Sequence, residues 1–235
     1  MLNNIHKLYM ESLNDKELEK YLYNDVLKRY KDNGQEHRLP HIKSIMHYAE
    51  KYAKVMELRK DLAITIGAYH DLGLINVDED KNRKDHPKES KKIVLNDDKL
   101  KRFFNEDEIK IIAQACYEHS SSLDGDIERS EYGKLIRNAD KSDKLIYEDL
   151  VEITRRYVKY SIKKDEDLTD DELFEETIWW IQNHYIAKNK ISFVTEDVKR
   201  VNEKELERTK RLSQDMERSR EIFDKINDRL KKEEL

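Results

Sequence analysis

The sequence predicts an almost wholly α-helical fold, and three observations support this prediction. The 235 residues include only five glycines and two prolines, too few to punctuate a many-stranded sheet. Charged residues make up 41% of the chain and hydrophobic residues 37%, with abundant Lys, Glu and Leu, which favour helices. Apolar residues recur every three or four positions through most of the chain, as they do on the buried face of a helix.

The first helices follow from this spacing. Residues 18–34 predict a helix that stops at its final glycine, and a second helix begins at Pro40, because proline suits a first helical turn. The next helix covers residues 62–71 and ends on a His-Asp pair. Residues 74–86 are too polar for a core helix and predict a loop.

The later helices are marked by their starts. Asn105 and Thr169 are each followed three residues later by glutamate, which is the pattern of a capping box. In a capping box the side chain of each of the two residues accepts a hydrogen bond from the backbone N–H of the other. Further helices are predicted over residues 86–95, 130–147 and 148–163. From Thr195 onward the chain is nearly all charged, with sparse apolar positions.

The C-terminal segment predicts a long charged helical extension. If it were continuous, it would reach roughly 50 Å at the rise of an α-helix. We expect it to lie partly on the core as a solvated helix; the alternative is an arm that pairs with a second subunit in a homodimer. We predict a core over residues 1–160 and an extension over residues 161–235, with one compact domain as the alternative.

Composition excludes several classes of partner. The formal net charge is -5 with both signs mixed along the chain, so we expect neither duplex nucleic acid nor a membrane surface as a partner. No apolar stretch approaches the roughly 20 residues that cross a bilayer, and the N-terminus lacks the pattern of a signal peptide. The single cysteine, Cys116, forms no internal disulfide and is expected to be a packed thiol. These features predict a cytoplasmic protein.

Four predicted helices each carry a histidine or an aspartate on the face expected to be buried. His41, His70, His119 and Asp140 each lie three or four residues from apolar positions on their own helix. Burying an aspartate costs several kcal/mol unless it is paired or coordinated. A shared divalent cation would offset that cost. Asp71, which follows His70, has two carboxylate oxygens and could bridge to a second ion.

Imidazole and carboxylate ligands predict one or two divalent ions (Fe, Mn, Co, Ni, Zn or Mg). The alternatives are a helix-end cap for Asp71 and a helix-start residue beside Pro87 for His86. The predicted ligands are His41, His70, Asp71, His86, His119 and Asp140.

Five segments carry a resemblance to a known family. "HRLPHI", "YHDLG", "HPKES", "YEHS" and "IRNADKSD" resemble the successive signatures of the HD-domain phosphohydrolase superfamily, over roughly residues 25–160. The resemblance implies an HD-domain helical core that binds one or two divalent metals. His41, His70, Asp71 and Asp140 match the positions that hold the first metal, and His86 and His119 those that complete a second site. The chain is most similar to small stand-alone bacterial members, since it lacks the Gly-Tyr-Pro triplet of the cyclic-diguanylate branch.

The resemblance implies a metal-dependent phosphohydrolase that cleaves a phosphate ester or anhydride, with a nucleotide as the expected substrate, by attack of metal-bound hydroxide. We predict catalytic roles for Asp71, Arg38 and Lys141, because phosphate also requires positive charge around it. Candidate substrate-binding residues are Arg38, Lys84, Lys88 and Lys144. The alternatives are a non-catalytic nucleotide-binding regulatory module and a di-iron oxygenase on the same scaffold. Residues 178–185, "IWWIQNHY", predict an aromatic core, with nucleobase stacking as the alternative.

Overall fold

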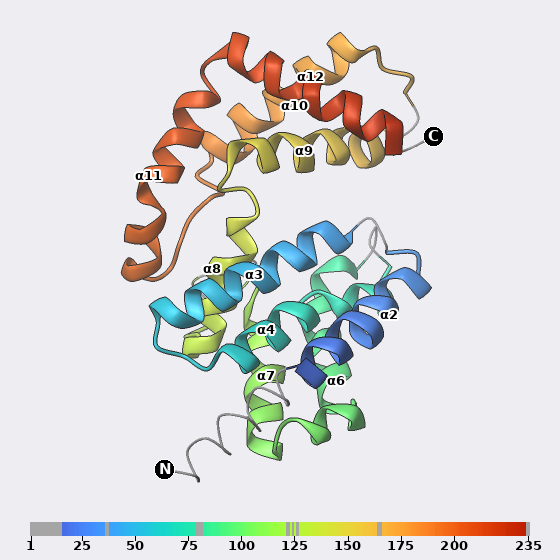
Figure 1. Ribbon diagram of the computed structural model, residues 1–235, viewed down its shortest axis with the longest axis vertical. Helices are drawn as coiled ribbons and strands as arrows, with labels where there is room; N and C mark the ends of the chain where they lie inside the picture. Colours follow the sequence, from blue (N-terminus) through green and yellow to red (C-terminus); the bar gives the residue numbers. More distant parts are fainter. Residues whose placement is uncertain are drawn as a thin grey trace. The chain divides into compact units, whose positions relative to one another are not determined.

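The computed structural model describes residues 16–35, 38–78, 82–120, 123, 125, 127–163 and 166–233 (Figure 1). All regular structure in these residues is helical, which confirms the predicted all-α fold. The chain forms two compact units, Met1–Asp140 and Lys141–Leu235. The predicted division at residue 160 stays a prediction. Within the described ranges, no helix combines the length and the apolar character needed to cross a bilayer.

The first unit is built from paired helices. α3 packs on α4, α6 packs on α7, and α7 also contacts α4. Apolar side chains such as Ile45, Tyr52, Ile66 and Ile112 are fully buried between them. The helices are α2 (Leu27–Asp32), α3 (Leu39–Val55), α4 (Lys60–Tyr69), α6 (His86–Leu95), α7 (Glu106–Glu118) and most of α8 (Glu131–Ser142).

The predicted starts and stops of several helices are confirmed. Pro40 and Pro87 lie in the first turns of α3 and α6. Asn105 and Thr169 form complete capping boxes with the glutamates three residues later. Gly34 has a φ of +73°, which side chains with a Cβ rarely adopt, and the helical segment before it ends there. Local sequence chemistry therefore fixes these ends.

Two predicted boundaries differ from the structure. The segment 74–86 contains short 3-10 turns, η3 (Leu72–Asn76) and η4 (Arg83–Asp85), and residues 79–81 lie outside the described residues. The helix predicted over residues 130–147 ends at Ser142. Ile146 has an extended backbone, with ψ of 128°, and this conformation redirects the chain into the next helix.

The second unit contains α9 (Tyr147–Tyr157), α10 (Asp170–Trp180), α11 (Glu196–Leu212) and α12 (Met216–Glu233). α9 and α10 each continue into a π-helical turn, η7 (Val158–Ile162) and η8 (Ile181–Ile186). α12 packs on α9 and α10, and the buried side chains Phe223 and Leu230 contribute to this core.

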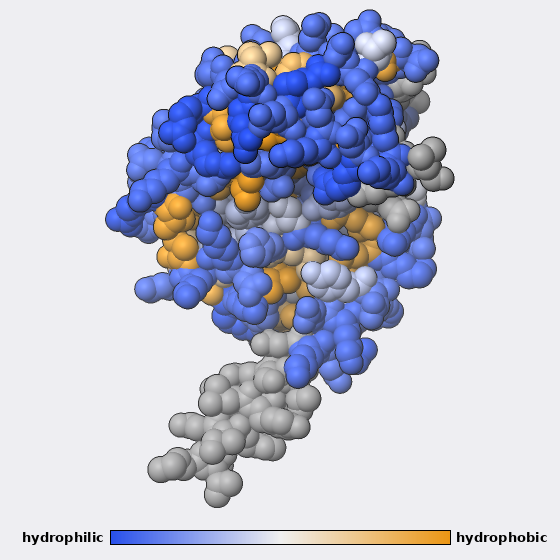
Figure 2. Space-filling view, turned by 45° about the horizontal axis from the view of Figure 1, so that its top comes forward, coloured by the Kyte–Doolittle hydropathy of each residue, from blue (hydrophilic) through white to orange (hydrophobic). Residues whose placement is uncertain are grey.

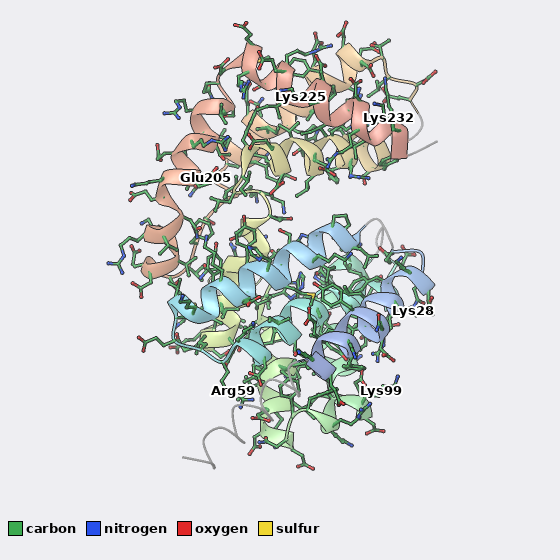
Figure 3. All side chains as sticks on the ribbon, in the orientation of Figure 1. Lys28, Arg59, Lys99, Glu205, Lys225 and Lys232 are labelled. Atoms are coloured by element: carbon green, nitrogen blue, oxygen red, sulfur yellow. The ribbon has the colours of Figure 1, made fainter. Side chains whose placement is uncertain are left out.

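The charged C-terminal extension is helical, as predicted, but it is interrupted between α11 and α12. α11 ends at Leu212, and the side chain of Asp215 accepts a hydrogen bond from the backbone N–H of Arg218 at 3.0 Å, which starts α12. Both helices keep a charged outer face, on which Figure 3 labels Glu205 of α11 and Lys225 and Lys232 of α12. Most of the face drawn in Figure 2 is hydrophilic, with small hydrophobic groups between the hydrophilic ones. The homodimer stays a prediction.

Candidate metal centre

Helix ends supply four histidines of the first unit. His70 is the C-terminal cap of α4, and His119 is the C-terminal cap of α7. His86 is the first residue of α6, and His41 lies in the first turn of α3. The last carbonyl groups of a helix have no partner within the helix, so a side chain that follows them can satisfy one.

Three of these imidazoles are hydrogen-bonded to backbone carbonyls of the turn that precedes them. In each ring Nδ1 lies close to the carbonyl oxygen three residues earlier, at 2.8 Å for His70, 2.7 Å for His119 and 2.6 Å for His86. A carbonyl oxygen only accepts hydrogen bonds, so each Nδ1 carries a hydrogen. In the neutral ring Nε2 then carries a lone pair. This arrangement prepares Nε2 as a metal ligand and fixes the ring orientation.

Asp71 lies among the Nε2 atoms. Its Oδ1 is 3.1 Å from Nε2 of His86 and 3.3 Å from Nε2 of His119. Its Oδ2 is 3.8 Å from Nε2 of His41 and of His70. Two groups of possible ligands therefore share Asp71, and within each group the ligand atoms lie within 4.8 Å of one another.

Asp140 adjoins the group that contains His41. It lies on α8, and its Oδ1 is 3.5 Å from Nε2 of His41. The structure thus brings all six sequence-predicted ligands together in the first unit, while their roles as ligands stay predictions. We call this set the Asp71 cluster: His41, His70, Asp71, His86, His119 and Asp140.

Two features of the Asp71 cluster fit a bound cation. Nε2 of His70 is fully buried and has no hydrogen-bond partner, an arrangement that costs free energy unless something else binds the lone pair. Nε2 of His86 and Nε2 of His119 lie 3.0 Å apart. Two lone pairs at this distance repel each other unless a proton or a metal ion lies between them. The donor set therefore fits divalent metal.

Burial and neighbouring charges adjust the protonation states. Burial lowers the pKa of His70 to about 4, although Asp71 opposes the shift, so the ring is neutral at neutral pH. Burial by itself would raise the pKa of Asp71. The charge that His70 carries when protonated, and the hydrogen bonds that His119 and His86 donate when their rings are protonated, outweigh it and hold that pKa well below its usual range. Burial lowers the pKa of His86, but the Asp71 hydrogen bond outweighs it and raises the pKa overall.

A serine and a glycine that the sequence analysis did not assign hold the His-Asp turn against α6. Ser90 Oγ donates to the carbonyl of His70 at 2.7 Å and accepts from the N–H of Gly73 at 2.8 Å. A Cβ on Gly73 would lie 2.1 Å from the carbonyl oxygen of His86, so only glycine permits this approach. Both residues belong to quoted motifs, "YHDLG" and "HPKES", which was the available signal.

Glu118, also unassigned by the sequence analysis, joins the end of α7 to the start of α8. Its side chain is buried, and Oε2 accepts from the N–H and the hydroxyl of Ser130 at 2.9 and 2.6 Å. Gln114 Nε2 donates to Oε1 at 2.7 Å. These bonds connect the helix that presents His119 to the helix that presents Asp140.

A second buried aspartate lies outside the Asp71 cluster. Asp97 Oδ2 accepts from the hydroxyls of Tyr21 and Tyr69 at 2.8 and 2.7 Å and from Nη2 of Arg29 at 2.5 Å. Tyr69 directly precedes His70, so this network anchors the end of α4. No periodicity or motif in the sequence marked Asp97.

The predicted cationic residues are less concentrated. Arg38 caps the start of α3, one turn before His41, and its Nε donates to Gln35 at 2.7 Å. Lys84 and Lys88 are exposed on η4 and α6. Lys141 and Lys144 belong to the second unit, where Lys144 Nζ lies 2.6 Å from Asp143 Oδ1. The catalytic and substrate-binding roles of these residues stay predictions.

Two further features lie apart from the proposed chemistry. Cys116 is fully buried, and burial raises the pKa of its thiol, which fits the expected packed side chain. A hollow of about 600 Å³ is lined by residues of the N-terminal helical segment, α3 and α4, including Leu22, Met46 and Ile64. No residue of the Asp71 cluster lines it.

Comparison with known families gives a match that covers the Asp71 cluster. Residues 38–145 match the family model described as HD domain, and this range includes every residue of the Asp71 cluster. The match confirms the resemblance drawn from the sequence motifs and is consistent with the HD superfamily of metal-dependent phosphohydrolases. Comparisons with curated proteins and with solved structures give no match.

Proposed function

We propose that the HD domain at residues 38–145 holds two divalent metal ions and hydrolyses a phosphorylated compound, with a nucleotide as the proposed substrate. The main support for the proposal is that the two carboxylate oxygens of Asp71 face two different pairs of imidazoles. Each carboxylate oxygen faces two Nε2 atoms, as a carboxylate that bridges two cations would. The ordinary alternative, a helix-end cap, does not explain why histidines from four helices converge on one carboxylate.

The ligand sets follow from these distances. His41, His70 and Asp140 would bind one ion together with Oδ2 of Asp71. His86 and His119 would bind the other together with Oδ1. A bound divalent ion would supply Lewis acidity and lower the pKa of a coordinated water toward neutrality.

The remaining tasks fall to the chain itself. The backbone bonds of Nδ1 hold three rings in the ligand orientation. Ser90 keeps the turn that bears Asp71 at a fixed distance from α6. Arg38, one turn before His41, would place a planar guanidinium near a bound phosphate, where it can pair with two oxygens.

Metal analysis combined with a substrate screen tests the proposal. The full chain is purified, its metal content is measured, and phosphate release is followed over a panel of nucleotides and simple phosphate esters. We expect about two ions per chain, as in two-metal hydrolases. His70→Ala should lower the metal content and reduce turnover by on the order of 10²-fold or more.

His47→Ala is the matched control, because His47 is exposed on α3 and lies outside the Asp71 cluster. Its metal content and turnover should equal those of the wild type. Equal turnover by the His70→Ala variant would contradict the proposed site. Nucleotide binding without product would indicate a regulatory module instead, and oxygen uptake by the iron-loaded protein would indicate an oxygenase.

A further inference from the structure

The second unit carries exposed aromatic side chains at the end of α9, in η7 and near the end of α10. Trp179 is 55% exposed, Tyr160 49% and Tyr157 40%. Tryptophan is usually well buried, and clustered exposed apolar side chains mark interaction surfaces. The predicted aromatic core is therefore wrong for Trp179, although Ile178 and Ile181 beside it are buried.

Ring contacts join these side chains into one group. Tyr157 and Trp180 meet edge to face with 5.5 Å between their centroids, and Trp180 is 5.7 Å from Trp179. Trp180 also contacts His184 at 4.9 Å. We call this group, with the neighbouring Tyr160, the aromatic surface: Tyr157, Tyr160, Trp179, Trp180 and His184.

The segments that carry the aromatic surface lack acidic residues. Residues 153–164 and 177–195 contain no aspartate or glutamate, although the chain has 51 such residues. Lys188 and Lys190 are exposed, and they reinforce the effect of burial in lowering the pKa of His184. Within the described residues, neither lysine forms an ion pair.

Other cations nearby have different partners. Lys159 Nζ lies 5.3 Å above the ring of the residue that follows it, a cation–π contact. Two flanking acids are engaged by their own neighbours: Glu152 pairs with Arg156 at 3.3 Å, and Glu176 lies 3.8 Å from Lys163. Glu175, one turn before Trp179, is exposed. The surface therefore combines exposed ring faces with the positive charge of Lys188 and Lys190.

The backbone beneath the aromatic surface is also unusual. Tyr160 lies within the π-helical turn η7, and His184 lies within the π-helical turn η8. π-helical turns are rare and recur at functional sites, because the wider turn changes the direction of the side chains that follow. η7 contacts α10 and η8 contacts α9, so each π-helical turn lies against the other helix of the pair.

We propose that the aromatic surface of the second unit binds single-stranded nucleic acid. Bases would stack on Trp179 and Tyr160, and Lys159, Lys188 and Lys190 would contact the phosphates. Exposed rings beside cations are the combination that sequence-tolerant single-strand binders use. A purely acidic peptide would use the lysines but leave the rings without a function, and a purely apolar partner would leave the lysines unused. The inference is independent of the phosphohydrolase proposal, because every residue it uses lies in the second unit.

Fluorescence anisotropy of the full chain with a labelled single-stranded oligonucleotide of about 15 nucleotides tests the proposal. Trp179→Ala should weaken binding about tenfold through loss of one stacked base, and Trp179→Phe should restore part of the affinity. The double variant Lys188→Gln, Lys190→Gln should reduce the slope of log affinity against log salt by about 1.4, the value for two phosphate contacts on a single strand.

The double variant Lys225→Gln, Lys232→Gln is the matched control. Both lysines are exposed on α12 (Figure 3), and their removal changes the net charge by the same amount. Its affinity and salt slope should equal those of the wild type. Asp71→Ala should also bind the oligonucleotide normally, so failure of the metal site and failure of the aromatic surface are distinguishable.

Three results would overturn the proposal. The first is no binding of single-stranded DNA or RNA at low salt. The second is binding that Trp179→Ala leaves unchanged. The third is equal displacement of the strand by polyglutamate, which would identify the surface as a docking site for an acidic protein.

Discussion

Asp71 and Asp97 are both buried in the first unit, yet their surroundings are opposite. Asp97 is surrounded by donors: two tyrosine hydroxyls and the Arg29 guanidinium all point at Oδ2. Asp71 is surrounded by imidazole nitrogens whose ring hydrogens are already committed to backbone carbonyls. The protein satisfies Asp97 by itself, whereas the neutral imidazole rings around Asp71 offer lone pairs that a divalent cation would bind. A buried carboxylate therefore indicates a binding site only when its neighbours are acceptors.

The largest expected effect is on turnover and metal content, which should depend on Asp71 and not on Asp97. Asp71→Asn should reduce turnover by on the order of 10³-fold, because it removes the charge shared by both proposed ions. Asp97→Asn should retain metal close to the wild-type content. Elemental analysis and phosphate release measure both. An Asp71→Asn protein that keeps two ions would remove the distinction.

The next effect concerns stability, where the substitution of Asp97 should have the larger effect and that of Asp71 the smaller. Asp97→Asn should lower the free energy of unfolding by about 2 kcal/mol, since Arg29 loses its carboxylate; the 30% exposure of Arg29 keeps the cost below that of a fully buried pair. Asp71→Asn should change the stability of metal-free protein by less than about 1 kcal/mol, because the imidazoles around Asp71, whose Nδ1 hydrogens are bonded to backbone carbonyls, donate to it only when they are protonated. Urea unfolding of chelator-treated protein gives both values. Equal losses would show that Asp71 is as well satisfied as Asp97.

A smaller effect concerns the support of the cluster. Ser90→Ala should weaken metal binding about tenfold, because the turn that bears Asp71 loses its bond to α6. Thr65→Ala is the control: this buried hydroxyl also donates to a backbone carbonyl, but to that of Asp61, which is not part of the cluster. Metal titration by calorimetry should show a change for Ser90→Ala alone. Equal weakening by both would indicate a general loss of packing.

The smallest effect is the pH dependence that Asp97 contributes. Burial tends to raise the pKa of Asp97, but hydrogen bonds from Tyr69 and Tyr21 and the Arg29 charge outweigh it, and the folded pKa lies below the ordinary value. The unfolded chain therefore takes up a proton first as the pH falls. The stabilisation is present above about pH 4 and is lost as the pH falls through the folded pKa. Asp97→Asn should flatten this part of the stability curve, and an unchanged slope would assign it to other carboxylates.

The sequence predicted the cluster better than its supports, for a physical reason. His41, His70, His119 and Asp140 continue apolar stripes of their own helices, so the helical period alone places them on buried faces. Asp97 continues no such stripe, and its partner Tyr21 is 76 residues away in the chain. Local spacing contains no information about such a pairing.

The helical class was predictable from composition, while two features of the second unit were not. The break between α11 and α12 occurs without glycine or proline, through the cap formed by Asp215. Trp179 is exposed because its neighbours Ile178 and Ile181 occupy the buried face of the same helix. The aromatic content of the segment was visible in the sequence, but the rotation of the helix, which decides which ring faces solvent, depends on packing against α9.

The hydrogen bonds between ring Nδ1 atoms and backbone carbonyls make the orientation of the proposed ligands depend on intact helix ends. His70 and His119 each cap the helix turn that orients them, so fraying of that turn and release of the ligand are a single event. Metal occupancy and local melting of these ends are thus thermodynamically linked. Loading with metal should slow amide hydrogen exchange first at the last turns of α4 and α7, before any change in global stability is detectable.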